Sequence, residues 1–421
     1  MSNQVKFMSN TMAGAPVLSN GWGDMTAMLD ACLVNGFNLK TAASVARSGD
    51  VATMTFATAH GFEAGQVLLV AGATPTAYNG EVIVTGVTTL TLTYAVAGTP
   101  STPPTGTITA KVAPLGFEIA FTGTNKRAYR SPNTAGPRNF LRVDDSNLSP
   151  WTSTYAKFAR VTIAEGMSDI DTFVGARAPF DPLAPTKNEI PTGSGTTAYG
   201  GWYKWYYARQ SYNESAGDGG ASAKDWCLIG DDRGFYLINS CFWSSGQRIV
   251  HGFNEFESFK TADPYRTVLL ASERYKTAAD TSSAYPADDN AIGNSASVVG
   301  RVMMRSFTGV GGTVAPMWVT LNDVNNTNNS GYSSGFAYPN GPDYGLIIHP
   351  IYMREGAVGG HLRGVMQGML WVHQNQPVPH LTILDNVIGY TGKKFIYLTF
   401  GLNIVGGNVS GFMFDLSGPW R

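Results

Sequence analysis

The feature of the sequence that most constrains the fold is a run of alternating residues between Gly49 and Val112. Around residues 89–94 and 107–112, apolar side chains alternate mainly with threonines. Alternation with a period of two indicates strands that have one face on a core and the other face in water. A unit of about 60 residues buries little surface and is only marginally stable alone. We therefore expect this run to be a small β-domain that leans on a larger body.

Three parts are expected along the chain. Residues 1–45 form an N-terminal segment that packs on the main body, residues 46–112 form the small inserted β-domain, and residues 113–421 form the main β-rich body with long loops. Glycine is abundant, with 49 residues, and long helix-forming runs are almost absent, which favours β structure. The predicted fold class is mainly β, with a multi-domain body resembling a β-sandwich or barrel and one short N-terminal helix.

The predicted helix covers residues 25–35. Its apolar residues recur at helical spacing and form one stripe, which predicts that the helix packs against another part of the protein. These residues are Met25, Met28, Leu29, Cys32 and Leu33. Asp24 is expected to cap the start of the helix, and Gly36 is expected to end it.

Strands are expected at intervals through the main body. Residues 226–238 are typical of a hairpin, because two apolar runs flank a Gly-Asp-Asp-Arg-Gly turn. Further strands are predicted at residues 139–145, 267–271, 298–305, 317–321, 345–353, 365–373 and 394–400. Polar stretches at 278–294 and 322–343 lie between them, and loops of that length usually contact a partner.

Composition excludes several classes of function. Only 14% of the residues are charged and the net charge is -1, so nucleic-acid binding is not expected. No apolar stretch approaches the roughly 20 residues that a membrane helix needs, and the N-terminus lacks the apolar core of a secretory signal. The chain is therefore expected to be made in a cytosol, without membrane insertion. Its cysteines, Cys32, Cys227 and Cys241, are interpreted as buried apolar residues rather than disulfide partners or metal ligands.

The sequence predicts no catalytic activity, no cofactor and no metal site. A Gly-x-Ser-x-Gly pattern at residues 331–335 lies in a loop-like context, whereas a nucleophile elbow needs a strand before it and a helix after it. The six histidines do not have zinc-ligand spacing. Acidic doublets at 144–145, 231–232 and 288–289 could ligate calcium, but turn residues are the favoured interpretation.

An aromatic run is the best candidate for recognition. It consists of Trp202, Tyr203, Trp205, Tyr206 and Tyr207. On a strand these rings would point to both faces, so some are expected to be exposed or to lie at an interface. Trp and Tyr are favoured at interface hot spots and stack well on sugars. Burial in the core of the protein, or between subunits, is the alternative to ligand binding.

Several segments carry a family resemblance. They are FMSNTMAGAPVLS (7–19), LDACLVNGF (29–37), residues 51–73, AYNG (77–80), APLGF (113–117), GTNK (123–126), YRS (129–131), LRVDD (141–145) and SGPWR (417–421). They resemble a family of tailed-bacteriophage virion structural proteins, found in tails and baseplates. The resemblance is densest over residues 7–145 and at the C-terminus, and residues 150–410 depart from it.

The resemblance implies an oligomeric structural role in the phage tail tip or baseplate. The expected partners are other tail or baseplate proteins and copies of the same chain, in a trimer or a hexameric ring. The expected location is the virion tail, after synthesis in the cytoplasm of the host bacterium. The alternative is a receptor-binding, glycan-recognising or glycan-depolymerising tail protein, although no solenoid repeat or paired-carboxylate cleft is visible in the sequence.

Overall fold

The computed structural model describes residues 4–149, 151–191, 201–210, 214–241, 248–273, 301–314, 316–319, 338–356, 360–374, 377–385, 387–400 and 410–421. These residues form three antiparallel sheets and a short N-terminal helix, which confirms the predicted mainly β fold. The motif at 331–335, the doublet at 288–289, the loop 278–294 and residues 322–337 of the second loop lie outside the described ranges.

The predicted helix is present, but its start is built differently from the prediction. It consists of α1 (Asp24–Leu29), which continues into the π-helical turn η1 (Asp30–Asn35) and ends at Gly36, where φ is 70°. The Asp24 carboxylate accepts hydrogen bonds from backbone N–H groups that precede the helix. The carboxylate of Asp145 accepts hydrogen bonds from the N–H groups of Gly23 and Met25, each at 2.9 Å. The first turn is therefore satisfied by a distant residue.

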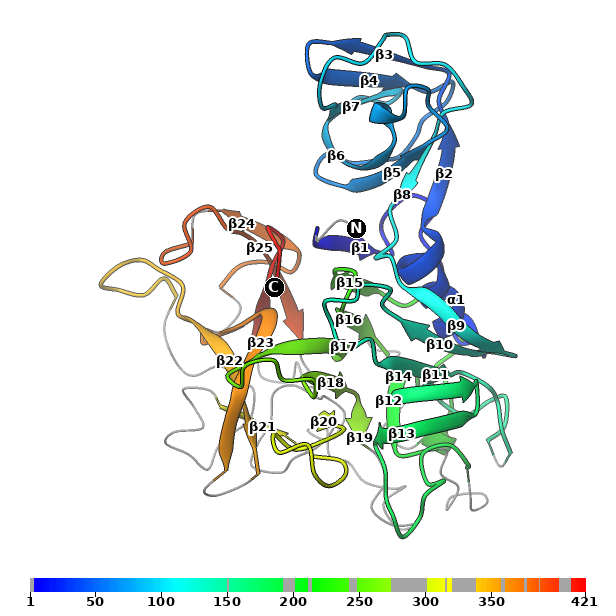
Figure 1. The fold of residues 1–421 in the computed structure, drawn as a ribbon, viewed down its shortest axis with the longest axis vertical. Helices are drawn as coiled ribbons and strands as arrows, with labels where there is room; N and C mark the ends of the chain where they lie inside the picture. Colours follow the sequence, from blue (N-terminus) through cyan, green and yellow to red (C-terminus); the bar gives the residue numbers. More distant parts are fainter. Residues whose placement is uncertain are drawn as a thin grey trace.

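The small domain is a curled seven-stranded sheet. Its strands are β2 (Phe37–Thr41), β3 (Ser44–Ser48), β4 (Val51–Thr55), β5 (Val67–Ala71), β6 (Gly80–Val87), β7 (Thr91–Ala95) and β8 (Thr109–Val112), in the order β2-β8-β5-β6-β7-β4-β3. β6 pairs with β5 through its first half and with β7 through its second half, so the sheet folds over on itself (Figure 1). The sheet begins at Phe37, so residues 37–45, assigned above to the N-terminal segment, pair within the small domain.

The body contains the other two sheets. The seven-stranded body sheet has the order β19-β14-β12-β11-β10-β9, with β13 also paired to β12. Its strands are β9 (Glu118–Gly123), β10 (Lys126–Arg130), β11 (Phe140–Asp144), β12 (Lys157–Asp169), β13 (Thr172–Ala178), β14 (Tyr203–Ala208) and β19 (Ser272–Glu273). The strand predicted at 139–145 is present as β11, whereas β12 and β13 were not predicted.

The twelve-stranded sheet follows the order β1-β15-β16-β17-β23-β26-β25-β24, and β18, β20, β21 and β22 pair off this path. Its strands are β1 (Lys6–Ser9), β15 (Trp226–Gly230), β16 (Phe235–Ser240), β17 (Arg248–Ser258), β18 (Thr267–Leu270), β20 (Arg301–Met303), β21 (Pro316–Val319), β22 (Ile348–Glu355), β23 (His361–Val372), β24 (Thr382–Asp385), β25 (Lys394–Phe400) and β26 (Ser410–Asp415). The predicted hairpin is present as β15 and β16. All three cysteines are buried and none forms a disulfide.

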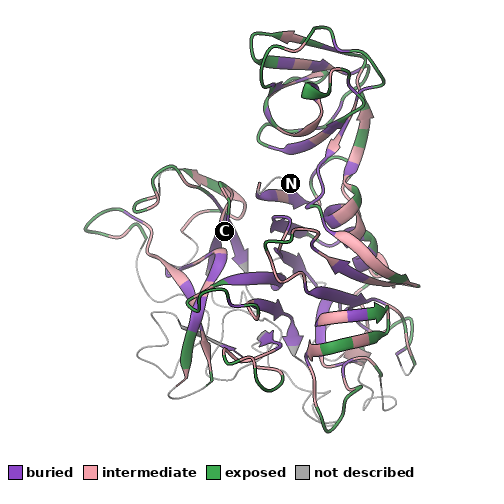
Figure 2. Ribbon diagram, viewed as in Figure 1, coloured by how far each residue is buried: buried purple, intermediate pink, exposed green. Residues whose placement is uncertain are grey.

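One apolar core runs from the small domain through the helix into the body. The same cluster of buried side chains includes Met54 and Tyr94 of the small domain, Leu33 of the helix, and Leu141 and Trp205 of the body. Figure 1 shows the small domain standing out from the body, and Figure 2 shows the buried residues concentrated in the sheets of the body. The small domain is therefore stabilised in part by the body, as its size requires.

Among the described residues, no helix has both the length and the apolar character that crossing a lipid bilayer requires.

Candidate functional site

The aromatic run lies on β14, and four of its five rings are buried within the chain. The exposed fraction is 3% for Tyr203 and 0% for Trp205, Tyr206 and Tyr207, whereas Trp202 is half-buried. Some of these rings were expected to be exposed or to lie at an interface. Trp202 keeps exposed surface, and the alternative, burial, holds for the other four rings. In the single chain, packing in the core of the protein accounts for them.

The four rings are buried because both faces of β14 are covered by other parts of the chain. On one face, Trp205 packs into the main core and its indole N–H donates to the carbonyl oxygen of Leu270 at 2.8 Å. On the other face, Tyr206 packs edge-on against Phe158, with ring centroids 5.5 Å apart. Tyr207 donates its hydroxyl to Asp145 at 2.7 Å.

His251 packs beside this run, and its burial leads us to expect that the fold becomes less stable at acid pH. Its ring is fully buried and stacks on Trp205, with centroids 5.7 Å apart. Burial, together with the nearby Arg209, lowers the pKa of His251 to about 3. In the unfolded chain the same group takes up a proton below about pH 6.5. Because only the unfolded state binds this proton between about pH 6.5 and pH 3, the free energy of unfolding falls as the pH is lowered through that window.

We expect His251→Gln to remove roughly 3 kcal/mol of the stability difference between pH 7 and pH 4. Urea unfolding at the two pH values measures it. Burial also lowers the pKa of the buried His373 and of the half-buried His380, to about 4 in each case. These two histidines therefore also make the protein less stable at low pH, and the His251→Gln variant retains that part of the pH dependence. The exposed His361→Gln serves as the control. An unchanged pH difference in His251→Gln would contradict the assignment.

The candidate ligand site is a cleft of about 330 Å³ on the outer face of the seven-stranded body sheet. Its lining residues come from β10, β11, β13, the turn before β13, and the loops that follow β11 and β13. They are Lys126, Arg142, Asp144, Leu148, Asp171, Phe173, Arg177, Thr186, Glu189 and Ile190. The exposed side chains of Asp171 and Ile190 place one side of the cleft in contact with solvent.

Strand register explains why these charges gather. Arg142 and Asp144 are two residues apart on β11, so they share one face, while Leu141 and Val143 point into the core. Asp144 lies opposite Lys126 on β10 and opposite Arg160 on β12. The outer face of this sheet therefore carries a ladder of opposite charges.

Asp144 is the centre of this ladder. Its carboxylate lies 3.0 Å from Arg142 and 2.9 Å from Arg160, and all three side chains are at most 2% exposed. Burial alone would raise the pKa of Asp144, but Arg160 and Arg142 hold it below its usual value. Asp171 adds an outer partner for Arg142 and Lys126. These cations are thus already neutralised by neighbouring carboxylates.

The loop that follows β13 closes one side of the cleft, and Asn188 holds it in place. The buried Asn188 amide donates to the carbonyl oxygen of Val161 at 2.9 Å and to the hydroxyl of Thr162 at 2.8 Å. Its oxygen accepts hydrogen bonds from the N–H groups of Trp202 and Tyr203. The next residue, Glu189, is thereby fixed at the wall of the cleft.

Glu189 and Arg177 are left incompletely satisfied. Both carboxylate oxygens of Glu189 and the Nε of Arg177 are inaccessible and make no hydrogen bond. The closest approach between the two side chains is 3.8 Å, from Arg177 Nη2 to Glu189 Oε2. Burial raises the pKa of Glu189, and Arg177 only partly offsets this. Other buried side-chain atoms of the described residues also lack a hydrogen bond, among them Gln66 Nε2 and Asn254 Nδ2, so this pair is one of several such sites.

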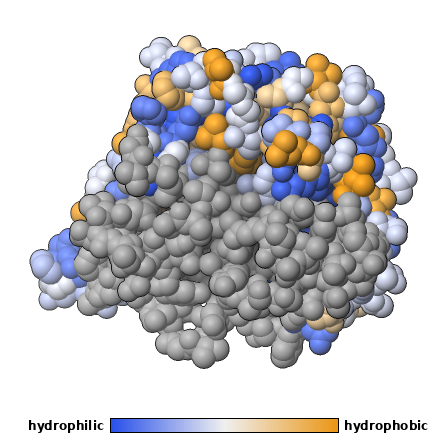
Figure 3. Space-filling model, turned by 90° about the horizontal axis from the view of Figure 1, so that it is seen from below, coloured by the Kyte–Doolittle hydropathy of each residue, from blue (hydrophilic) through white to orange (hydrophobic). Residues whose placement is uncertain are grey.

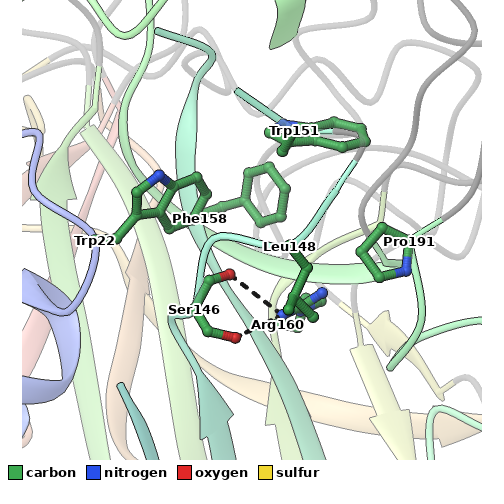
Figure 4. Close-up of a pocket in the computed structure, with 7 residues that line it drawn as sticks. All are labelled: Trp22, Ser146, Leu148, Trp151, Phe158, Arg160 and Pro191. Atoms are coloured by element: carbon green, nitrogen blue, oxygen red, sulfur yellow. Dashed lines mark hydrogen bonds between the residues drawn. The ribbon is translucent and has the colours of Figure 1, made fainter. Parts of the chain in front are cut away.

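A second, smaller space shares Leu148 with the cleft as a lining residue. Figure 4 shows the side chains that line it: Trp22, Ser146, Leu148, Trp151, Phe158, Arg160 and Pro191. Arg160 donates to the carbonyl oxygen and the hydroxyl of Ser146, at 3.3 and 3.2 Å. The volume is about 10 Å³, which is about the size of one water molecule. This space is too small for a ligand.

The acidic doublets differ in role. Asp231 lies in the β15–β16 turn and accepts hydrogen bonds from the N–H groups of Arg233 and Gly234, as predicted for a turn residue. Asp144 and Asp145 are buried instead, so the turn interpretation is wrong for them. Within the described ranges, no group of three or more His, Cys, Asp or Glu side chains is placed to hold a metal ion.

Sequence reasoning did not find the cleft. The alternation of Arg142 and Asp144 on one strand was a usable signal, but the register with β10 and β12 and the return of the loop carrying Glu189 are tertiary features. No protein-family model and no curated protein matches the chain.

Proposed function

We propose that this chain is a structural component of a tailed-phage virion, in the tail tip or baseplate, and that it acts through protein–protein contacts. The resemblance described above motivates the proposal. The observation that supports it is the way the resembling segments meet around the N-terminal helix. The Asp145 carboxylate accepts a hydrogen bond from the N–H group of Met25 at the start of the helix, and Tyr129 donates its hydroxyl to Asp30 at 2.8 Å. Lys6 on β1 forms an ion pair with Glu81 of the small domain.

These contacts lie where the body meets the projecting small domain (Figure 1), and Lys6 and Glu81 each directly adjoin a resembling segment. A projecting domain offers most of its surface to neighbours. Apolar side chains exposed there include Leu39, Ile83, Val87 and Leu90. On the face of the molecule shown in Figure 3, the described apolar residues occur in small separate groups. Contacts in an assembly would accordingly combine several small apolar groups with polar ones.

Detection of the chain in purified virions tests the proposal. An antibody raised against the small domain should label intact particles at the tail, and mass spectrometry should find the chain in stoichiometric amounts. A phage-encoded protein that acts only inside the infected cell is the control. Absence of the chain from washed virions would contradict the proposal.

Self-assembly into a trimer or hexameric ring is the second part of the proposal. Light scattering should give three or six times the chain mass of 45.0 kDa. Trp202 is the one ring of the aromatic run with exposed surface, so we expect Trp202→Ala to weaken assembly and Trp202→Phe to preserve it. Trp205→Ala cannot serve as this test, because it removes a fully buried ring from the core. A wild-type chain that stays monomeric at high concentration would contradict self-assembly.

A further inference from the structure

We infer that Asn340 is a site of spontaneous covalent modification, at which the side-chain amide is lost and aspartate or isoaspartate forms. The reaction is an attack by the backbone nitrogen of Gly341 on the Asn340 side chain, with solvent water as the co-reactant. The inference holds whether or not the chain is a virion protein. It rests on the Asn-Gly sequence, on the hydrogen bonds of the glycine nitrogen atoms and on the space around Gly341.

The reaction balances without an oxidant or a reductant. The Gly341 nitrogen forms a bond to Cγ of Asn340, and the bond from Cγ to Nδ2 breaks. The proton of the Gly341 N–H group passes through solvent to the departing nitrogen, which leaves as ammonia. Water then opens the cyclic imide at either of its carbonyl carbons, which gives aspartate or isoaspartate. Glycine favours the first step because it has no Cβ atom to hinder the approach of its nitrogen.

The sequence contains four Asn-Gly pairs, and hydrogen bonds restrain three of them. The pairs are residues 20–21, 35–36, 79–80 and 340–341. The N–H group of Gly21 donates to a side-chain carboxylate at 2.9 Å, and that of Gly36 donates to a carbonyl oxygen of the helix at 2.8 Å. The side-chain amide of Asn79 is held by the backbone of Ala73 through two hydrogen bonds, at 2.9 and 2.8 Å. These three pairs therefore react only after the structure opens locally.

The fourth pair is accessible to solvent. The N–H group of Gly341 makes no hydrogen bond to the part of the chain that the structure describes. Gly341 is exposed, and a Cβ atom built on it would meet no heavy atom beyond its chain neighbours within 4 Å. The half-buried Asn340 donates through Nδ2 to the exposed carboxylate of Asp343 at 2.7 Å, within the same turn. The reacting nitrogen is therefore available in the folded chain.

Modification changes the turn that leads into β22. In the unmodified chain the carbonyl oxygen of Asn340 accepts a hydrogen bond from the N–H group of Tyr344 at 2.7 Å. A carboxylate at position 340 has no proton to donate to Asp343, and the two negative charges repel each other. Isoaspartate also adds one carbon atom to the path of the backbone. We expect the turn to loosen, so that the Tyr344 amide exchanges its hydrogen faster in the modified chain.

Incubation of the purified full chain in neutral buffer, followed by peptide mapping with mass spectrometry, tests the inference. We expect Asn340 to be modified at least about tenfold faster than Asn20, Asn35 and Asn79, because those three wait for local opening. In concentrated urea, where the chain is unfolded, the four pairs should react at similar rates, because they share the Asn-Gly sequence.

Gly341→Ala is the test variant, because the open space around Gly341 accommodates a methyl group and its φ lies outside the left-handed region. We expect the rate at Asn340 to fall about tenfold, since a Cβ atom hinders the attack. Gly312→Ala is the matched control, because Gly312 is also exposed in open space and should leave the rate unchanged. Thermal unfolding verifies that both variants are folded.

Three results would overturn the inference. One is a rate at Asn340 in the folded chain that is no faster than at the other three pairs. Another is the same preference for Asn340 in urea, which would mean that the fold does not select the site. The third is an unchanged rate at Asn340 in Gly341→Ala. These outcomes are independent of whether the chain is found in virions.

Discussion

Replacing Arg363 by methionine is expected to lower the free energy of unfolding by about 3–5 kcal/mol. Arg363 lies on β23 with its side chain 1% exposed. It donates to Asp263, which is fully buried, at 3.1 Å and to Glu355 at 2.7 Å. It also donates to the carbonyl oxygens of Tyr265 and Arg305, at 3.2 and 3.3 Å. Removal of the guanidinium leaves the Asp263 charge buried without its cation.

The control is a salt bridge that is exposed to solvent instead of buried. Lys394 and Asp385 lie 3.7 Å apart with more than half of each side chain exposed, so Lys394→Met should change stability by less than about 0.5 kcal/mol. Urea unfolding compares the variants. The double variant Arg363→Met, Asp263→Asn should recover part of the loss, because it removes both charges. Equal effects of Arg363→Met and Lys394→Met would show that the buried pair is not held as described.

Replacing Trp420 by alanine is also expected to lower the free energy of unfolding by about 3–5 kcal/mol. Trp420 is 6% exposed and lies against Tyr236, with ring centroids 5.7 Å apart. A Cβ atom added at Gly368 would meet the Trp420 ring at 2.1 Å, so only glycine allows this approach. Arg421 then binds Asp231 in the β15–β16 turn at 2.7 Å. The last residues therefore fasten the end of the chain to the twelve-stranded sheet.

Trp420→Phe separates packing from hydrogen bonding. The indole N–H donates to the carbonyl oxygen of Asp415 at 2.8 Å, and phenylalanine loses this bond but keeps most of the buried ring. We expect an intermediate stability, measured by thermal and urea unfolding. If Trp420→Ala were as stable as the wild type, the C-terminal residues would not be fastened in solution.

Local patterns were sufficient for the elements that their own residues determine. The alternation at residues 89–94 and 107–112 predicted β7 and β8, and the apolar stripe at 25–35 predicted the helix. The hairpin at 226–238 was found because its turn residues lie between two apolar runs. In each case the signal and the structure lie within about a dozen residues, where periodicity and turn chemistry act.

The same patterns failed where a distant segment decides the outcome. The rings of β14 were the best candidate for recognition, with burial in the core as the alternative, because nothing in the run itself says that both faces of the strand are covered. Asp144 and Asp145 looked like turn residues, but β10, β12 and the helix surround them. The cleft depends on a loop held by Asn188, whose partners lie on two other strands. Strand register and the position of a loop depend on contacts between distant segments, so a short window of sequence does not reveal them.

The hydrogen bond from Met25 to Asp145 also sets an order for synthesis. Its acceptor is translated 120 residues after its donor. At about 5–20 residues per second, a ribosome supplies that carboxylate roughly 6–24 s later. All the strands of the small domain, which end at Val112, are translated during this delay. A nascent chain therefore contains the whole small domain before it contains Asp145, the residue directly after β11 whose carboxylate accepts hydrogen bonds from the start of the helix.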